Sequence, residues 1–454
     1  MEVEALRGAL ARLASKHLDE LRRLVEIPSV STEGRGIDDA ANAVASLLEE
    51  RGLRTEIRPT KGNPVVCAWG GAASGPTLLF YVHYDVQPVE PLEEWTTPPF
   101  EVTERDGKLF GRGTADTKGH IICRLAAIDA VREVFGSDPI RYAFMIEGEE
   151  EIGSPNLEAF IEENADDFRA DGCLWEFGGV TTEGRPSVTL GLKGIQSLEL
   201  RAQVPSRDVH SSFGVVIDNP LYRLAAAIAS MRDADGHVTI DGFYDDVRPL
   251  TEAEHEAIED EPQRGKQLKA EYGIERFLGD ASGFELKRRL NAEPCLNING
   301  IHGGYGGPGT KTVLPAKAIG KLDFRLVPDQ RPERVVEQLR AHLDRLGFAD
   351  IEVVPLAGEG PGRTALDDPF VEIVCAAARD AFGMEPTVHV SSAGTGPAAP
   401  FQDVLRVPFA TAGCSYPGSR GHAPDEHIRI ADFDNGKLHT ALVIAAMAGS
   451  SRAI

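Results

Sequence analysis

An apolar run at Leu78–Val82 ends abruptly in His83, and Asp85 follows two residues later. A Gly-Pro pair precedes the run and a proline follows it closely, boundaries that are typical of a buried strand. In an open α/β sheet, ligands bind just beyond the carboxyl ends of such strands. An imidazole with a carboxylate behind it is also how proteins orient a metal-binding histidine. The motif alone fits a strand that merely ends in polar residues, so it predicts a site only if other segments supply more ligands.

Apolar strand-like segments at 65–69, 77–83, 140–146 and 173–175 alternate with helical patterns. This alternation predicts an α/β fold in which a mostly parallel sheet is sandwiched by helices. From about Gly194 the pattern changes to half-exposed strands and a polar, acidic, helix-prone stretch at 243–292, which predicts an inserted, smaller α+β domain. We therefore expect the larger domain to comprise residues 1–193 and 359–454, and the inserted domain to comprise residues 194–358.

The charge balance argues against polyanionic partners. The chain has 71 aspartates and glutamates against 47 lysines and arginines, a formal charge of −24. Such a surface repels phosphate backbones and anionic lipids, so we expect no nucleic-acid and no membrane partner. No run of eighteen apolar residues occurs, and the first helix is amphipathic and charged, unlike a signal peptide. The six scattered cysteines form no Cys-x-x-Cys pair, which is typical of reduced thiols in a cytoplasmic protein.

Three further segments place carboxylates at comparable positions. Asp116 lies in the glycine-rich stretch GRGTADTKG just before a helix, where it would either bind a metal or cap that helix. Glu150 and Glu151 directly follow the 140–146 strand; adjacent glutamates there allow one to bind a metal and the other to move a proton, although acidic clusters also occur in solvated turns. Glu176 follows the 173–175 strand, and its alternative is an ordinary loop carboxylate.

Histidines in two later loops complete the candidate set. His422 and His427 lie in GHAPDEHIRI, and His210 lies in RDVHSSFG of the inserted domain; each also fits a surface position. The stretch GGYGGPGTKT resembles a phosphate loop but lacks its Gly-Lys pair, and no Gly-x-Ser-x-Gly nucleophile motif occurs.

Taken together and in this order, these motifs resemble those of the dinuclear-zinc exopeptidase family. That family contains carnosinases, cytosolic non-specific dipeptidases, aminoacylases, acetylornithine deacetylases, succinyl-diaminopimelate desuccinylases and glutamate carboxypeptidases. The resemblance spans nearly the whole chain. The segments HYDVQP, EGEEEIGS, KTVLP (311–315) and RLVPDQ (325–330) look most like the dipeptidase branch.

The resemblance implies a site for two divalent ions, Zn²⁺ first and Mn²⁺ or Co²⁺ as alternatives. It assigns the ligands as a bridging Asp116, with His83 and Glu176 on one ion and Glu151 and His422 on the other. It further implies that Asp85 orients His83, that Glu150 is the general base, and that the Asp116-Thr117 peptide is cis.

By the same resemblance, the reaction is hydrolysis of the amide bond of a dipeptide by metal-activated water. Arg325 would hold the substrate carboxylate, with Thr312 and Gly396 as further substrate-binding candidates. His210 would stabilise the oxyanion from the partner subunit, which implies a homodimer formed through the inserted lid domain.

Two departures from the dipeptidase pattern keep other substrates open. Glu176 stands where dipeptidases usually have aspartate and deacylases often have glutamate, and His210 is followed by Ser-Ser where Ser-Gly is commoner. The alternatives are a deacylase or desuccinylase of N-acyl amino acids, or a carboxypeptidase of the same family. A catalytically silent metal-binding scaffold is a third reading, disfavoured because all the expected ligands and the base are present. A glycosidase would leave the histidines unexplained.

Overall fold

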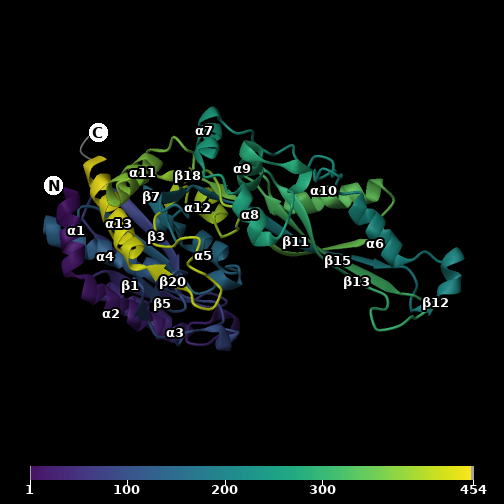
Figure 1. Ribbon diagram of the computed structural model, residues 1–454, viewed down its shortest axis with the longest axis horizontal. Coiled ribbons are helices and arrows are strands. Elements are labelled where there is room, and N and C mark those ends of the chain that lie inside the picture. The colour runs from purple at the N-terminus through teal and green to yellow at the C-terminus, as the bar shows by residue number, and fades with distance from the viewer. Residues whose placement is uncertain (1, 451–454) are drawn as a thin grey trace. The chain divides into compact units, whose positions relative to one another are not determined.

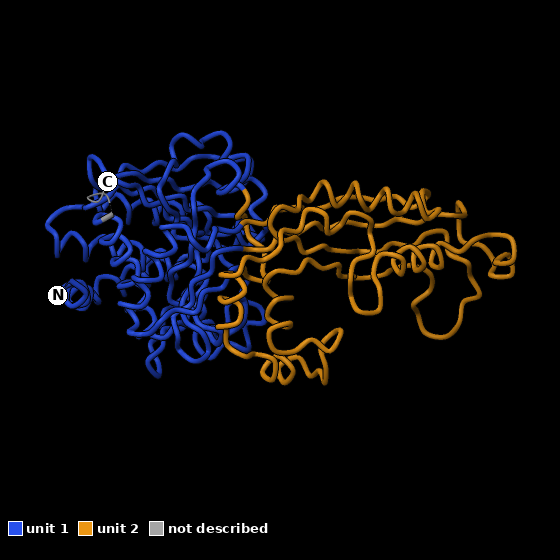
Figure 2. Tube along the Cα trace, turned by 90° about the horizontal axis from the view of Figure 1, so that it is seen from above, with its two compact units in different colours: residues 1–191, 363–390, 400–454 blue, residues 192–362, 391–399 orange. Residues whose placement is uncertain are grey.

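The computed structural model describes residues 2–450 and forms two compact units (Figures 1 and 2). In the described part of the chain, unit 1 comprises residues up to 191, 363–390 and those from 400 onward. Unit 2 comprises Leu192–Gly362 and Ser391–Ala399. No helix among the described residues is long and apolar enough to cross a membrane.

Unit 1 is built on a six-stranded mixed sheet. The strands in spatial order are β1 (Arg54–Arg58), β2 (Val65–Gly71), β6 (Arg141–Glu147), β3 (Thr77–His83), β7 (Gly172–Trp175) and β19 (Phe409–Thr411). The β6–β3, β3–β7 and β7–β19 pairs are parallel, whereas β1–β2 and β2–β6 are antiparallel. The prediction of an α/β fold with a mostly parallel sheet is therefore confirmed, with an antiparallel hairpin at one edge.

Helices cover this sheet, and a buried helix follows the glycine-rich turn. The helices of unit 1 are α1 (Glu2–Arg12), α2 (Ala14–Val25), α3 (Ile37–Glu49), α4 (Lys118–Phe135), α5 (Leu157–Asn164), α11 (Pro369–Phe382), α12 (Ala399–Asp403) and α13 (Ile430–Ser450). The single N-terminal helix expected from the sequence is thus two helices. α4 packs against α1, α2, α13 and the strand β3. Because α4 is buried on nearly all sides, burial rather than amphipathicity fixes its place.

Short strands complete unit 1. They are β4 (Thr103–Arg105), β5 (Lys108–Phe110) and β20 (His427–Arg429) in one three-stranded sheet, and β8 (Gly179–Val180), β9 (Pro186–Thr189) and β18 (Thr387–His389) in another. β10 (Gly191–Leu192) and β17 (Gly362–Arg363) lie where the chain passes from one unit to the other.

The central strand β3 explains where polar chemistry can gather. All seven of its residues are buried, as expected for a strand with parallel neighbours on both sides. In register, His83 lies opposite Glu147 at the end of β6. Parallel strands end at the same edge of a sheet, so the residues that follow β3, β6 and β7 meet there.

Unit 2 contains a four-stranded antiparallel sheet with helices. The strands in spatial order are β13 (Cys295–Gly303), β15 (Lys317–Leu326), β11 (Gly194–Gln203) and β16 (Glu352–Glu359). The other elements are β12 (Val209–His210), β14 (Val313–Leu314), α6 (Pro220–Ala229), α7 (Glu252–Asp260), α8 (Gly265–Tyr272), α9 (Gly283–Ala292) and α10 (Pro332–Arg345). One sheet face packs with α6 and α10 around an apolar core that includes Leu198, Leu322 and Phe324. The acidic 243–292 stretch contains α7, α8 and α9.

A buried charge network joins α2, α3 and α4 in unit 1. Arg51, which is 5% exposed, contacts Glu20 at 2.8 Å and Asp129 at 2.7 Å. Lys16 and His17 also face Asp129, at 2.7 and 3.3 Å. Burial would raise the pKa of Asp129, but His17, Arg51 and Lys16 outweigh it and hold this pKa well below its ordinary value. The network contributes to the stability of unit 1 through buried charge pairs.

We expect Arg51→Met to lower the free energy of unfolding of unit 1 by about 3–5 kcal/mol, because it removes the buried cation that two buried carboxylates share. The folded-state pKa of Asp129 is depressed, so its contribution is present above the unfolded pKa of about 3.9 and is lost as the pH falls below it. Urea denaturation at neutral and acidic pH measures both effects. Arg22→Met is the matched control, because its pair with Asp19 is exposed and contributes at most about 1 kcal/mol.

Candidate metal centre

Five sequence segments of unit 1 converge at the carboxyl edge of the central sheet. His83 is the last residue of β3, Glu150 and Glu151 lie in the turn after β6, and Glu176 follows β7. Asp116 lies in the glycine-rich turn before α4. The fifth segment is the loop before β20, which contains His422 in a left-handed backbone conformation with φ 63°.

Asp116 lies between two histidines. Its Oδ1 is 3.1 Å from Nε2 of His83, and its Oδ2 is 3.0 Å from Nε2 of His422. Nε2 of His422 is also 3.1 Å from Oε2 of Glu151. Each oxygen of one carboxylate thus faces a different imidazole, the arrangement that a bridging ligand requires. The Asp116-Thr117 peptide is cis, which confirms the sequence prediction.

The electrostatics of the cluster fit cations. Asp116, Glu150, Glu151 and Glu176 crowd one edge, and Oε2 of Glu176 is buried without a hydrogen-bond partner. Burial, followed by repulsion from Glu150, raises the pKa of Glu176 well above its ordinary value. Burial raises the pKa of Glu150 to about 7; His83 opposes this shift, and Asp116 and Glu151 add to it. Donor atoms of His83, Asp116 and Glu151 lie within 4.8 Å of one another, a nitrogen and oxygen set suited to divalent ions.

Asp85 fixes the orientation of His83. Nδ1 of His83 is 3.0 Å from the backbone oxygen of Asp85 and 3.3 Å from its Oδ1. When Nδ1 donates its proton there, Nε2 is left with a lone pair directed toward Asp116. The other carboxylate oxygen of Asp85 accepts the backbone N–H of Glu151 at 3.1 Å, so one fully buried side chain ties two segments of the site together.

The ion pair Arg112–Glu426 is a support of the site that sequence reasoning missed. Oε1 of Glu426 accepts the backbone N–H groups of Ala115 at 2.9 Å and Asp116 at 3.0 Å. Its Oε2 accepts a 2.6 Å hydrogen bond from Arg112, which also donates to the backbone oxygen of Pro88 at 2.9 Å. Both side chains are almost fully buried. The pair therefore links the glycine-rich turn to the segment after His83 and to the loop containing His422.

Glu426 stands four residues after His422 in the same polar loop. Its closeness to a candidate ligand was the feature of the sequence that could have identified it. His427, the second histidine singled out in that loop, points elsewhere. Its Nε2 is 2.6 Å from the Tyr416 hydroxyl and its Nδ1 is 2.8 Å from the backbone oxygen of Asp425.

The substrate-side candidates belong to unit 2 and form two groups. Arg325 donates to Oγ1 of Thr395 at 2.7 Å, directly beside Gly396. Elsewhere in unit 2, β12 pairs with β14, and the backbone oxygen of Thr312 accepts the Ser211 N–H at 3.2 Å. His210 is exposed, and its Nδ1 is 2.8 Å from Oγ of Ser212. The structure therefore brings Arg325 to Gly396 and His210 to Thr312.

Two histidines and four carboxylates at the end of a parallel-rich sheet define a metal-dependent hydrolase. Residues 79–445 match the protein family described as Peptidase family M20/M25/M40, and the chain belongs to this family. It is a metallopeptidase by that membership and by its site.

Individual relatives support the assignment. The chain is 32% identical to the Beta-Ala-His dipeptidase of Homo sapiens, over 97% of this chain and 86% of that protein. It is similar to the structure of the M20 family metallo-carboxypeptidase Sso-CP2 from Sulfolobus solfataricus, with a TM-score of 0.88, 37% identity and coverage of 95% of this chain and 99% of that one. It is also similar to the structure of the di-peptidase Dug1p from Saccharomyces cerevisiae, with a TM-score of 0.80, 25% identity and 98% coverage of both chains.

We expect Glu426→Gln to lower the metal affinity of the site by about 10–100-fold, the usual effect of removing a group that orients a ligand. The glutamine amide has a single acceptor oxygen, so its nitrogen would face, donor against donor, either the Arg112 guanidinium or the backbone N–H groups of Ala115 and Asp116. Either orientation breaks the link between Arg112 and the turn that carries Asp116. Competition with a chromophoric chelator measures the affinity. Arg51→Met is the matched control, since it breaks a buried ion pair of unit 1 that contacts none of these segments. Wild-type affinity in Glu426→Gln would contradict the positioning role.

Proposed function

We propose that this chain is a dinuclear metallodipeptidase. The observation that carries the proposal is Asp116, whose two carboxylate oxygens face His83 and His422 with Glu150 beside them. The dipeptidase names of the human and yeast relatives support the substrate class.

Within this proposal, five side chains hold two divalent ions. Asp116 would contact both ions, His83 and Glu176 would hold one of them, and Glu151 and His422 would hold the other. The ligands are nitrogen and oxygen donors only, which favours Zn²⁺ and also suits Mn²⁺ or Co²⁺. When bound, the two ions would lower the pKa of a shared water and polarise the amide carbonyl.

Glu150 is the proposed general base. Its Oε2 lies 3.9 Å from Nε2 of His83, at the edge of the ligand cluster but outside the ligand set. The carboxylate takes the proton from the attacking water and returns it to the leaving amine. Its side chain is about one-fifth exposed, so it can exchange protons with a bound substrate.

Unit 2 supplies the substrate-side groups in the proposal. Arg325 binds the free carboxylate of the substrate, for which a planar guanidinium is suited, and the loop containing Thr395 and Gly396 flanks it. His210, beside Thr312, donates a hydrogen bond to the oxyanion. Unit 2 thereby acts as a lid domain.

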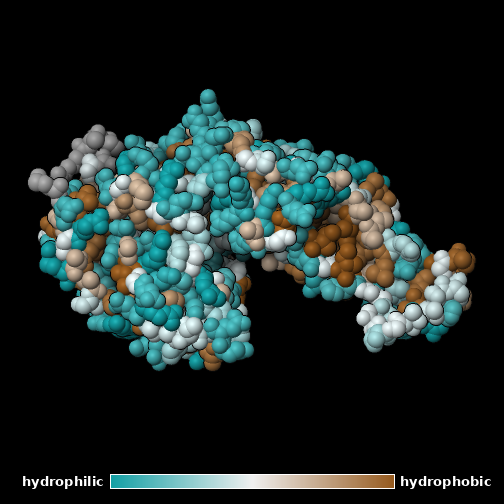
Figure 3. All heavy atoms as spheres, viewed as in Figure 1, coloured by the Kyte–Doolittle hydropathy of each residue, from teal (hydrophilic) through white to brown (hydrophobic). Residues whose placement is uncertain are grey.

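We also propose that the protein is a homodimer formed through unit 2 and that His210 serves the partner's site. β13 is an edge strand of its sheet, and Ile298 and Ile301 on it are 44% and 50% exposed. Figure 3 shows apolar residues gathered over part of unit 2. An unpaired strand edge with exposed apolar side chains is a surface that proteins normally cover.

Three further proposals concern alternative substrates and the location of the protein. Glu176 favours N-acyl amino acids as second-choice substrates, and the similarity to Sso-CP2 favours a carboxypeptidase as the other alternative. All six cysteines are free, which supports a cytoplasmic location.

Hydrolysis of a matched substrate panel tests the function. The panel contains dipeptides, N-acetyl and N-succinyl amino acids and N-blocked dipeptides, offered to enzyme loaded with Zn²⁺ or Mn²⁺. We expect cleavage of the free dipeptides alone and its loss on chelation. Cleavage of the acyl amino acids instead would make the protein a deacylase, and cleavage of the blocked dipeptides would make it a carboxypeptidase.

Subunit complementation tests both Glu150 and His210. We expect Glu150→Gln to lower turnover by about 10²–10⁴-fold and His210→Ala by about 10²–10³-fold, with bound metal unchanged in both. Co-expression of the two variants under different tags yields a mixed dimer in which one site combines an intact Glu150 with an intact His210 from the other chain. Purified mixed dimer should regain roughly half of the wild-type turnover. A mixed dimer as inactive as its parents would exclude catalysis by His210 of the partner subunit.

A further inference from the structure

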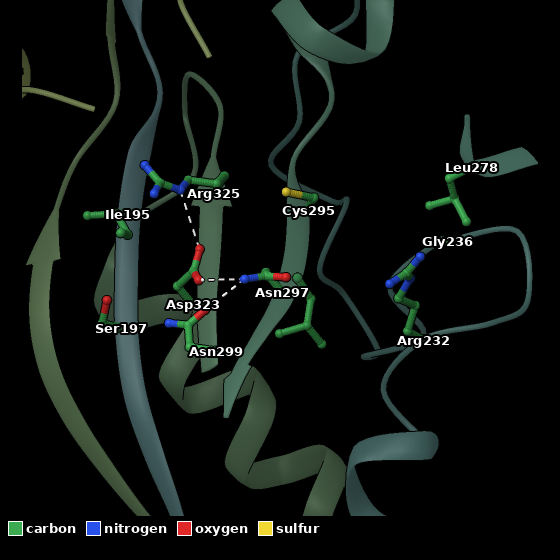
Figure 4. Close-up of a pocket in the computed structure, with 11 residues that line it drawn as sticks. Ile195, Ser197, Arg232, Gly236, Leu278, Cys295, Asn297, Asn299, Asp323 and Arg325 are labelled. Atoms are coloured by element: carbon green, nitrogen blue, oxygen red, sulfur yellow. Dashed lines mark hydrogen bonds and ion pairs between the residues drawn. The ribbon is translucent and has the colours of Figure 1, made fainter. Parts of the chain in front are cut away.

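Unit 2 contains a cavity of about 620 Å³, lined by both polar and apolar residues, on the sheet face opposite α6 and α10 (Figure 4). Its floor consists of β11, β15 and β13, which lie side by side. Its far wall includes Arg232, Gly236 and Leu278. The cavity lies entirely within unit 2, and Arg325 stands on its floor.

The strand register arranges the floor in two rows. Ile195, Arg325 and Cys295 lie opposite one another in the first row. Ser197, Asp323 and Asn297 form the second row, two residues further along the strands. Two residues along an antiparallel strand span about 6.8 Å. A ligand whose carboxylate binds Arg325 can therefore reach the second row with a long side chain.

Asp323 is the buried charged group of the cavity. It is only 7% exposed, and each of its oxygens has one partner at 3.3 Å: Nε of Arg325 and Nδ2 of Asn297. Both contacts are at the long end of the hydrogen-bond range. Asn297 also donates to Oδ1 of Asn299 at 2.7 Å, and Arg325 also donates to Thr395. A buried carboxylate with two shared, distant donors retains the capacity to accept stronger hydrogen bonds.

We propose that this cavity receives the C-terminal residue of the substrate and that Asp323 selects a basic side chain there, lysine or arginine. The inference rests on the proposed function, in which Arg325 holds the substrate carboxylate. A lysine or arginine side chain can span the distance between the two rows, and it would add a charged N–H donor to the two 3.3 Å contacts that Asp323 already makes. Ser197 and Asn297 flank the same position with neutral polar groups.

Two arginines that line the cavity oppose a cation. Arg325 contacts Asp323 directly, but in the proposal it binds the substrate carboxylate, which neutralises its charge. Arg232 on the far wall has no ion pair or hydrogen bond within residues 2–450. Arg232 is exposed, so solvent and salt screen its repulsion of a cation. Asp323 acts from a buried position, where the effective dielectric constant is lower and a contact of the same length is stronger. The buried carboxylate therefore dominates the charge preference of the cavity.

The test compares Ala-Lys, Ala-Leu and Ala-Glu as substrates of the metal-loaded full-length enzyme. We expect kcat/KM for Ala-Lys to exceed that for Ala-Leu by about tenfold, the contribution of one hydrogen bond to a charged group, with Ala-Glu the poorest. Asp323→Asn keeps an acceptor for Arg325 and removes the charge, so the ratio of Ala-Lys to Ala-Leu should fall to about one. Equal losses on both substrates would overturn the proposal, because Asp323 would then act only by positioning Arg325. A wild-type preference for Ala-Glu would also overturn it.

Glu199→Gln is the matched control. Glu199 lies two residues beyond Ser197 on β11, pairs with Arg201 at 2.7 Å and does not line the cavity. The Glu199→Gln substitution removes one carboxylate from the same strand, so the ratio of Ala-Lys to Ala-Leu should stay at the wild-type value. A Glu199→Gln effect as large as that of Asp323→Asn would overturn the proposal, because general charge would then explain it.

A second readout separates this inference from the proposed dipeptidase activity. If N-acetyl amino acids are the substrates instead, the ratio of N-acetyl-lysine to N-acetyl-leucine replaces the dipeptide ratio. Calorimetric titration with free lysine and free leucine measures the same preference without turnover. Tighter binding of lysine that disappears in Asp323→Asn supports the subsite even when no dipeptide is cleaved, and equal binding of both amino acids contradicts it.

Discussion

Mutual repulsion among buried carboxylates is the constraint on which the active edge of unit 1 depends. Asp116, Glu150, Glu151 and Glu176 meet beyond the ends of parallel strands, and burial raises the pKa of Glu150 and of Glu176. Hydrogen bonds from His422 and His83 outweigh burial at Asp116 and hold its pKa below the ordinary value. Divalent ions bound there would supply the positive charge that allows all of these carboxylates to be ionised at neutral pH.

The scaffold around the cluster is rigid because its supports are charged and buried. Asp85 connects His83 to the backbone of Glu151, and Glu426 connects the turn of Asp116 to Arg112. A buried ion pair is a weak source of net stability when compared with apolar packing. The buried charged groups here serve to position the metal ligands, because each hydrogen bond fixes the position of a segment that carries a ligand. The Arg51 network has the same chemistry without a ligand beside it, so it serves stability alone.

Unit 2 presents a different kind of polar surface. One face of its sheet packs with α6 and α10 around an apolar core, and on the other face Asp323 and Arg325 alternate with core residues along β15. This alternation follows from the two-residue period of a strand. The sequence therefore contained this alternation, whereas Arg325 itself was assigned through the resemblance to the family. The cross-strand rows that place Ser197 and Asn297 beside Asp323 required the register.

The sequence by itself determined the chemistry and its approximate location. An apolar run that ends in His83, a glycine-rich turn with Asp116, and Glu150-Glu151 after a strand predicted candidate metal ligands at one edge of an α/β sheet. The order of these motifs, through its resemblance to the dinuclear-zinc exopeptidase family, indicated a metallohydrolase. Tertiary structure decided what local pattern cannot encode. Residue pattern alone did not separate His422 from His427, and only the family resemblance selected His422; in the structure His422 faces Asp116, while His427 pairs with Tyr416. Glu426 and Arg112 are 314 residues apart and gain their role only through a contact that the folded chain creates. Pairings over such distances depend on how the whole chain packs, and for this reason neither composition nor periodicity reveals them.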